Sequence, residues 1–519
     1  MIELVSVDNM RRSDKYTIDN FVDSKELMYR AGLGVYNSVE WTGPVAVVCG
    51  SGNNAGDGFV IAKLLHDNNI DCCLYIISDK MSEDGRYYFE ICRDAGVAYK
   101  FVNRNITDEN QNEVIQTAGI NSRFSFKDYK MIVDCIFGTG FHGTVKGIAA
   151  DIIKAINESG AYVVSVDINS GLNGDSGIAE LCVKSDLTVA VGSFKPGHFL
   201  NMAKDMIKSK VNVDIGIKLL DKPYKLLEVT DLTEVFPERK NHSNKGTYGY
   251  LALIGGSLKY NGAIRLAYMA NAAMRSGAGV VKLATPKSIC RELIPNILET
   301  TLFPLSDNDG DVVFVREEID SLIKNVKTVA FGMGIGLSEE SAKILEYLLK
   351  VYKGTLIIDA DGLTIFSKID KELIKNARCK LVLTPHIKEF SRLTGCEVAE
   401  IFASPIEKAK NYAKENGLVL LLKGPSTIIT DGEEVFITDR GCAGMATAGS
   451  GDVLSGIVAA TCAYCKDLLL ATAAAAYING RAGELAEAEF GSISMIAGDT
   501  VAKLPAAIME IQGIERNDK

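Results

Sequence analysis

The first 220 residues alternate short apolar runs with longer segments of helical periodicity. The apolar runs lie at residues 45–49, 72–77, 131–137, 162–168 and 187–192. They are apolar at successive positions, as strands buried on both faces of a parallel sheet are. Segments such as 59–68 and 148–159 have helical spacing and indicate crossover connections. The pattern therefore predicts a doubly wound α/β domain over residues 1–222.

The same alternation resumes in the second half of the chain. Its apolar runs lie at residues 250–256, 280–285, 328–334, 356–361, 381–385 and 418–424. Residues 219–246 between the halves are polar and contain proline, which indicates a connection between domains. No internal repeat links the halves, so we expect a second, unrelated α/β domain over 230–510.

Composition narrows the class of protein. The 519 residues are 47% hydrophobic and 24% charged, with a formal net charge of −10. That charge predicts no general attraction to nucleic acid or an anionic membrane, and no apolar run approaches the roughly 20 residues of a membrane span. Twelve cysteines in this length favour a reduced, cytoplasmic protein. The pair Cys462 and Cys465 fits core packing, with a zinc or redox site as the alternative.

The first candidate site follows the apolar run at 45–49. Residues 50–58, GSGNNAGDG, lead into a helical segment and formally match the dinucleotide pattern GxGxxG/A. Backbone N–H groups of such a turn and the helix N-terminus attract anions. Asp57 is unusual there, because its carboxylate would compete with a pyrophosphate at the helix N-terminus. Alternatively, Asp57 is a helix cap and the asparagines are turn formers.

Two further loops follow buried strands of the first domain. Asp134 precedes glycines at 138, 140 and 143; Asp167 lies at the end of the run at 162–168, and Ser170 follows it. Ligands of open α/β sheets bind at the carboxyl ends of strands, so we expect the three loops to converge.

These motifs carry a resemblance. SKELMYRAG, GSGNNAGDGF, DCIFGTGFHG, VDINSG and FKPGH, in this order, are similar to the motifs of the NAD(P)H-hydrate epimerase family. The resemblance implies a Rossmann-like three-layer αβα fold, with K⁺ held by Asn54, Asp134 and Ser170. Asp134 would be the proton carrier or charge stabiliser. The implied substrate-binding residues are Asn53, Asn54, Ala55, Gly56, Asp57, Gly138, Thr139, Gly140, Phe141, His142, Gly143, Thr144 and Asp167. Asn169 departs from the family's usual proline.

The second candidate site is the segment 444–460, GMATAGSGDVLSGIVAA. A glycine-rich turn at 448–451 precedes an apolar helix, with Asp452 at the turn. Backbone donors beside a carboxylate suit phosphoryl transfer from a nucleotide to a hydroxyl, with Asp452 as general base. The alternative is that Asp452 only caps the helix. The phosphate-binding pattern GxxxxGK[ST] is absent from the sequence.

Other segments of the second half suit a nucleotide site at strand ends. Lys423 opens the turn KGPST, although a lone lysine is more often a solvated surface charge. Asp359 and Asp361 of IDADGL would support Mg²⁺ or the structure. His386 in LTPHIKEF follows a buried strand, where a lone histidine is usually structural.

Together these segments resemble the ribokinase-like NAD(P)H-hydrate dehydratase family over most of residues 242–500. The shared motifs run from KGTYGYLALIGGS to SMIAGDT in the expected order. Asn244 and Asn479 stand where the family usually has histidine. The resemblance implies catalysis by Asp452 and substrate contacts from Ala263, Gly334, Gly336, His386 and Asp452. Implied nucleotide contacts are Lys423, Gly424, Pro425, Ser426, Thr427, Ala448, Gly449, Ser450 and Gly451.

The two resemblances imply a bifunctional enzyme that repairs hydrated NADH and NADPH. The first domain would interconvert the R and S epimers at C6, and the second would dehydrate the S epimer with ADP, or alternatively ATP, and Mg²⁺. A homo-oligomer without nucleic-acid or membrane partners is expected. Three other functions stay open. One is a vitamin-type kinase fused to a Rossmann oxidoreductase. Another is a vitamin- or sugar-type kinase fused to a non-catalytic nucleotide-binding domain that acts as a sensor. The third is a purely structural role, against which the two sets of strand-end glycine loops argue.

Overall fold

The computed structural model describes residues 1–102, 124–258, 262–294 and 299–514 and divides into two compact units. One unit comprises residues 3–223, and the other comprises residues 224–519 with the first two residues. The predicted boundary falls in the segment 219–246, but this segment is no simple linker, because it contains strand β9 (Tyr224–Leu226). Strand β9 pairs with β20 (Val435–Thr438) and extends the sheet of the second unit.

The first unit is built on a parallel sheet of order β4-β3-β2-β5-β6-β7-β8. Its strands are β2 (Val45–Cys49), β3 (Cys72–Ile76), β4 (Ala98–Phe101), β5 (Met131–Cys135), β6 (Tyr162–Val166), β7 (Leu187–Val191) and β8 (Lys210–Val213). Strand β1 (Ile2–Leu4) precedes them. The helices are α1 (Val7–Asn20), α2 (Ser24–Asn37), α3 (Asn53–Asp67), α4 (Glu83–Asp94), α5 (Ile148–Asn157) and α6 (Ala203–Met206).

Two buried clusters make this unit a three-layer αβα structure. One packs residues of α2, α3 and α4, such as Phe59, against one face of the sheet. The other packs α5, through residues such as Ile152, against the opposite face. The chain's single tryptophan, Trp41, stacks on Tyr36 with ring centroids 5.8 Å apart, beside the first cluster. The apolar strands predicted from the sequence account for both faces, and the predicted α/β class is confirmed.

The second unit has a mixed sheet of order β9-β20-β19-β18-β17-β16-β15-β10-β11-β12. The strands not yet given are β10 (Tyr250–Ile254), β11 (Val280–Pro286), β12 (Thr301–Leu305), β15 (Thr328–Phe331), β16 (Thr355–Ile358), β17 (Lys380–Leu383), β18 (Val419–Leu422) and β19 (Thr427–Thr430). The strands from β12 to β18 in this order pair in parallel, whereas β19 pairs antiparallel with β18 and β20. A short hairpin joins β13 (Asp307–Asn308) to β14 (Asp311–Val312).

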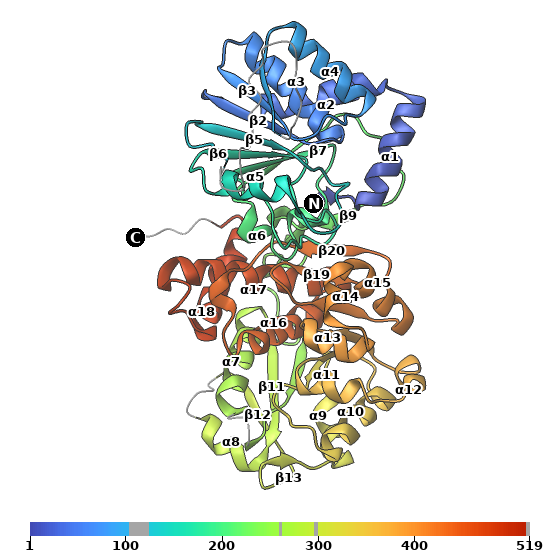
Figure 1. Cartoon of the computed structure of the whole chain (residues 1–519). Helices are drawn as coiled ribbons and strands as arrows, with labels where there is room; N and C mark the ends of the chain where they lie inside the picture. Colours follow the sequence, from blue (N-terminus) through green and yellow to red (C-terminus); the bar gives the residue numbers. More distant parts are fainter. Residues whose placement is uncertain (103–123, 259–261, 295–298, 515–519) are drawn as a thin grey trace. The chain divides into compact units, whose positions relative to one another are not determined.

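Helices cover both faces of this sheet. One side carries α7 (Gly262–Arg275), α16 (Ser450–Tyr464), α17 (Leu468–Phe490) and α18 (Ala497–Ile511), which form one large buried cluster with the strands. Figure 1 shows the helices between β14 and β18 on the opposite side. They are α9 (Arg316–Ile323), α10 (Glu339–Val351), α11 (Asp361–Phe366), α12 (Lys371–Lys375), α13 (Ile387–Thr394), α14 (Val398–Ala403) and α15 (Pro405–Asn416), while α8 (Lys287–Leu293) follows β11. The apolar stretch 453–478 belongs to two buried helices, α16 and α17.

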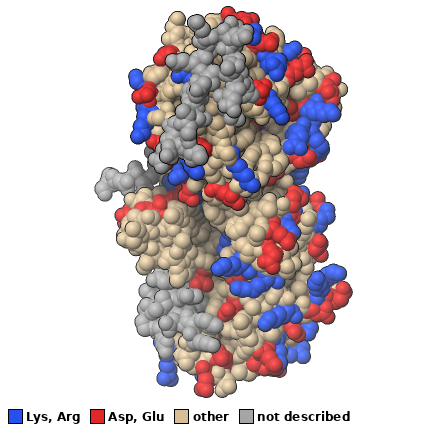
Figure 2. All heavy atoms as spheres, viewed as in Figure 1, with Lys and Arg blue, Asp and Glu red and all other residues tan. Residues whose placement is uncertain are grey.

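Surface charge is mixed. Over the face drawn in Figure 2, lysine and arginine side chains are interspersed with aspartate and glutamate. A small anion would therefore be held by local groups of a site and not by a broad basic field. Within the described ranges, no helix combines the length and apolarity needed to cross a membrane.

Candidate active sites

Loops that follow β2, β5 and β6 line a cavity of about 570 Å³ in the first unit. The three strands are parallel neighbours in the sheet, so their carboxyl ends meet at one edge. The chain order reverses between β2 and β5, which makes this edge the switch point where α/β sheets bind ligands. Helices α1 and α2 close the cavity with residues such as Asp14 and Met28.

Most of the substrate-binding residues predicted for this unit lie together. Those that line the cavity are Asn53, Asn54, Asp57, Gly138, Thr139, Gly140, Phe141, His142 and Asp167. Ala55 and Gly56 are buried in α3, and Gly143 and Thr144 are not among the lining residues. The predicted helix boundary was wrong: α3 begins at Asn53 with Gly52 as its N-cap, not near residue 59. Asp57 is thus inside the helix and is not its cap.

Asp134 is buried behind the cavity and does not line it. Its Oδ2 accepts hydrogen bonds from the Ser165 hydroxyl and the Ser170 backbone N–H, both at 2.9 Å. Its Oδ1 accepts from the Ile136 N–H and the Ser170 hydroxyl. Burial raises the pKa of Asp134, against the effect of these hydrogen bonds. With both oxygens engaged and no exposure to the cavity, this geometry gives Asp134 no direct path to a substrate proton.

Of the three residues predicted to hold K⁺, Asp134 and Ser170 are hydrogen-bonded to each other, and Asn54 contacts the end of β6. Asn54 donates from Nδ2 to the Val166 carbonyl at 3.2 Å, and its buried Oδ1 has no hydrogen-bond partner in the structure. The Ser170 hydroxyl joins Asp134 to the 137–139 loop, where it accepts from the Phe137 N–H at 2.8 Å. Carboxylate, amide and hydroxyl oxygens suit a hard cation, and an unpaired buried acceptor is costly without one. The residues therefore fit a bound monovalent cation.

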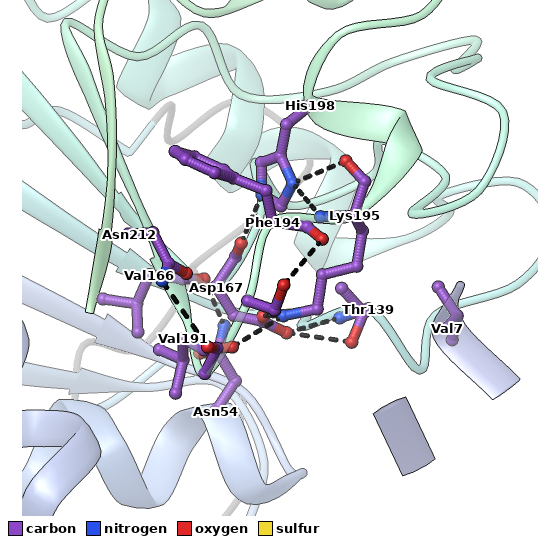
Figure 3. A network of polar contacts seen from close by, with 12 residues as sticks. Val7, Asn54, Thr139, Val166, Asp167, Val191, Phe194, Lys195, His198 and Asn212 are labelled. Atoms are coloured by element: carbon purple, nitrogen blue, oxygen red, sulfur yellow. Dashed lines mark hydrogen bonds and ion pairs between the residues drawn. The ribbon is translucent and has the colours of Figure 1, made fainter. Parts of the chain in front are cut away.

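Asp167 is the most tightly held carboxylate of the cavity (Figure 3). Its Oδ1 accepts a hydrogen bond from the Lys195 ammonium at 2.6 Å, and its Oδ2 accepts from the N–H and hydroxyl of Thr139, both at 3.0 Å. Burial opposes ionisation of Asp167, but the Lys195 charge and these hydrogen bonds outweigh it and lower the pKa. Asp167 therefore faces the cavity as an anion that already has a cationic partner.

Two other acidic side chains in the cavity have the opposite tendency. Burial raises the pKa of Asp57 well above its ordinary value, and the charge of Asp167 adds to the effect. The pKa of Asp14 is also raised by burial, against the effect of Lys195. Asp14 and Lys195 were not among the site residues predicted from the sequence. For Lys195 the signal was its place directly after an apolar strand, within the motif FKPGH.

The candidate site of the second unit lies at the ends of four adjacent parallel strands. Residues from the ends of β15, β16, β17 and β18 approach the N-terminus of α16, which is capped by Gly449 in a left-handed conformation (φ +95°). Asp452 lies in the first turn of this helix and is not its N-cap. The buried hydroxyl of Ser450 has no hydrogen-bond partner in the structure. An anion at this helix end would meet the free N–H groups and the helix dipole.

Lys423 is not a solvated surface charge. Its ammonium donates to Asp359 Oδ1 at 3.0 Å, and the Ser455 hydroxyl of α16 donates to Asp359 Oδ2 at 2.6 Å. A Cβ placed on Gly451 would lie 3.7 Å from the Lys423 ammonium, so the lysine sits directly beside the glycine-rich turn. Burial opposes the charge of Lys423, but the charges of Asp359, Glu389 and Asp452 raise its pKa. The positive charge of Lys423 at Asp359 Oδ1 disfavours a metal cation at this carboxylate, which leaves Asp359 poorly suited to the Mg²⁺ role expected as one option.

His386 and Asp361 organise the neighbouring strand ends. His386 is the N-cap of α13, where its Nδ1 accepts from two backbone N–H groups, and its side chain is 49% exposed. Burial and the charge of Lys423 lower its pKa, so the ring is neutral at pH 7. Asp361 Oδ2 accepts from the Gly336 N–H at 2.9 Å and thereby shapes the loop that contains Gly334.

The remaining predicted residues of this unit divide as follows. Gly424, Pro425 and Ser426 form the turn between β18 and β19, which begins at Thr427, and the Ser426 hydroxyl donates to Asp439. Ala448 to Gly451 make the turn before and into α16. Ala263 belongs to α7, but its side chain lies outside the described residues. Within the described chain, no cluster of three or more His, Cys, Asp or Glu side chains could hold a metal ion.

Comparison with known proteins finds a family for each half of the chain. Residues 251–506 match the family model described as NAD(P)H-hydrate dehydratase, and residues 24–197 match that of the YjeF-related protein N-terminus. A bifunctional NAD(P)H-hydrate repair enzyme from Thermofilum pendens is 32% identical, over 98% of this chain and 97% of its own length. The chain belongs to the family of bifunctional NAD(P)H-hydrate repair enzymes. Its homologue from Archaeoglobus fulgidus is 34% identical over 93% of this chain and 94% of that protein.

Solved structures are also similar to the second unit of this repair-enzyme family member. The ADP/ATP-dependent NAD(P)H-hydrate dehydratase of Bacillus subtilis, co-crystallised with ATP and Mg²⁺, is 27% identical with a TM-score of 0.46. The match covers 54% of this chain and 97% of that one. A ribokinase-like superfamily protein from Enterococcus faecalis is 25% identical with a TM-score of 0.49, over 57% of this chain and 98% of that one. The predicted family is confirmed by the family models and by the full-length relatives.

Proposed function

We propose that the second unit dehydrates the S epimer of hydrated NADH or NADPH with ADP as phosphoryl donor. The observation that carries this proposal is Asp452 in the first turn of α16, beside the turn at Gly449 and the anchored Lys423. Asp452 accepts the proton of the C6 hydroxyl while that oxygen attacks the β-phosphorus of ADP, and AMP leaves. The nitrogen lone pair of the ring then forms a double bond to C6 and expels phosphate, and loss of the C5 proton restores the C5=C6 bond.

The chain's own groups bind and orient this nucleotide. The N–H groups of Gly449 to Gly451 face the transferring phosphoryl group, and Lys423 neutralises charge beside them. Mg²⁺ is usually held by few carboxylates and the nucleotide phosphates, so we propose that it enters bound to ADP. His386 and the loop of Gly334 and Gly336 are the proposed contacts of the nicotinamide substrate.

We propose that the first unit supplies the S epimer by inverting C6. Inversion requires a bond at C6 to break and form again on the other face, with a proton moving on and off the C6 oxygen. Asp167 and Asp57 line the same cavity with pKa values shifted in opposite directions, which suits proton exchange with a bound hydroxyl. A K⁺ held by Asn54, Asp134 and Ser170 would fix the surrounding loops and offset negative charge near the pyrophosphate.

A racemic substrate tests both proposals in one reaction. The full-length protein is incubated with ADP, Mg²⁺, K⁺ and an R/S mixture of hydrated NADH, and absorbance of reduced nicotinamide is followed with AMP and phosphate. Complete conversion, with one AMP and one phosphate for each NADH, is expected. Conversion that stops when the S form is consumed would refute the epimerase assignment. Absence of NADH formation from pure S epimer with either ADP or ATP would refute the dehydratase assignment.

A further inference from the structure

Asp167 has a backbone conformation that its residue type disfavours. Its φ of +64° lies in the left-handed region, which a residue with a Cβ adopts only when its surroundings impose it. It follows β6 directly and lines the cavity of the first unit. Non-glycine residues held in this way occur preferentially at functional sites. The contacts that impose this conformation on Asp167 therefore bear on the function of the cavity.

Two residues of one turn after β7 contact Asp167, one at its carboxylate and the other at its backbone carbonyl (Figure 3). The Lys195 ammonium donates to the carboxylate at 2.6 Å and to the Val191 carbonyl at 2.8 Å. The His198 ring lies 2.7 Å from the backbone carbonyl of Asp167 through Nε2, and its Nδ1 accepts from the Lys195 N–H at 2.9 Å. These roles require a neutral ring with its proton on Nε2. Side chain and main chain of Asp167 are thus fixed by the same turn.

The other carboxylate oxygen of Asp167, Oδ2, contacts the 138–140 loop. Oδ2 accepts from both the N–H and the hydroxyl of Thr139. A Cβ placed on Gly138 would lie 3.1 Å from this oxygen, so the loop passes close against the carboxylate. The chain of contacts therefore runs from Lys195 through Asp167 to the 138–140 loop on the cavity wall.

Lys195 itself is buried, with 1% of its side chain exposed, and its ammonium is committed to Asp167 and Val191. Burial of a lysine ammonium costs free energy unless the charge is paired, so a buried lysine indicates a structural or functional role. We propose that Lys195 is a positioning residue of the epimerase reaction: it holds Asp167 so that the carboxylate faces the cavity and fixes the 138–140 loop for the hydrated cofactor. This inference rests on the proposed epimerase function of the first unit.

The test uses full-length protein, K⁺ and the pure R epimer without ADP, with R and S separated by chromatography. Lys195→Met is expected to lower kcat/KM for inversion about 100-fold, as a misplaced catalytic group does. Lys195→Arg, which retains the charge, should recover at least a tenth of the wild-type value. Lys208→Met is the matched control, because Lys208 is 77% exposed and contacts only Asp186 at the surface.

Two readouts separate positioning from a general loss of structure. Without Lys195, burial raises the pKa of Asp167, so the acid limb of the rate profile should move to higher pH in Lys195→Met. The other ionisable groups that line the cavity or contact Asp167 are unchanged in this variant; they are His198, His142, Asp14, Asp57, Asp84 and Arg11. In an Asp167→Asn background, Lys195→Met should add less than a two-fold loss, because the two residues act as one unit.

The outcomes distinguish the inference from the function on which it rests. A wild-type protein that does not invert the R epimer would contradict the proposed function itself. Wild-type inversion with an unchanged rate and pH profile in Lys195→Met would overturn the positioning role. Losses that multiply in the double variant would also overturn it, because Lys195 would then act by a route independent of Asp167. The double variant removes both charges together, so it remains informative even where Lys195→Met unfolds.

Discussion

Asp359→Asn is a sharp test of the nucleotide site in the second unit. Asparagine has nearly the shape of aspartate, and its amide oxygen can still accept the hydrogen bond from the Ser455 hydroxyl. The amide group that would then face Lys423 carries no charge to hold the ammonium. Only 3% of the Asp359 side chain and 21% of the Lys423 side chain are exposed. The substitution therefore releases Lys423 from its place beside the turn at Gly451.

The magnitude follows from this burial. Removing one partner of a buried, hydrogen-bonded charge pair costs about 2–5 kcal/mol. Because about a fifth of Lys423 reaches solvent, part of this cost is recovered by hydration, and we expect about 3 kcal/mol. If the position of Lys423 is needed for phosphate contact, this corresponds to roughly a 100-fold loss of kcat/KM for ADP.

The assay measures NADH formation while ADP is varied at a saturating concentration of the S epimer. In a second series the S epimer is varied at saturating ADP. Asp361→Asn is the matched control, because Asp361 lies in the same turn but accepts from the Gly336 N–H. It should raise KM for the hydrated cofactor and leave the ADP dependence within about three-fold. Asp359→Asn with an ADP dependence equal to wild type would show that the ion pair does not position Lys423 for the nucleotide.

Three further predictions concern separate groups. Asp452→Asn should lower the dehydration kcat by about 10²–10⁴-fold, as loss of a general base does, with ADP binding by calorimetry retained; near-normal turnover would make Asp452 structural. Asp134→Ala, or replacement of K⁺ by Li⁺, should abolish inversion while dehydration of pure S epimer continues; inversion at the wild-type rate in the variant would refute the cation site. Burial lowers the pKa of His198 to about 4 from 6.5, so the first unit should lose about 3 kcal/mol of stability as pH falls from 6.5 to 4. If the unfolding free energy of His198→Gln falls as much as that of the wild type over this range, His198 is not the source of the loss.

The sheets of both units could be predicted from the sequence because their parallel strands are buried on both faces. Runs such as 45–49 and 131–137 contain β2 and β5 with little error at their first residues. Glycine-rich turns located the strand-end loops for a different reason. At Gly50, for example, the chain passes so close that a Cβ would lie 2.0 Å from the Ile136 carbonyl oxygen. The start of α3 was missed because Asn53 and Asn54 are typical of turns, and tertiary contacts overrode that preference.

Pairings between distant residues could not be predicted from local pattern. Lys195 and Asp167 are 28 residues apart, and Lys423 and Asp359 are 64 apart. A lysine looks solvent-exposed in a sequence, and only the fold shows that each of these two faces a buried carboxylate. Strand β9 escaped notice for a related reason, because its three residues lie in a polar segment and gain their partner from β20.

The position of Trp41 has a practical consequence for spectroscopy of this chain. It is the only indole in the 519 residues, and its ring NH donates to the Tyr36 carbonyl within the first unit. Intrinsic indole emission therefore reports unfolding of that unit alone, whereas circular dichroism averages over the helices of both. Each unit has its own buried core, so the two signals need not change together, and a single melting temperature is not a defined property of the full chain. Emission at Trp41 thus gives a selective optical readout of the half that binds K⁺ in our proposal.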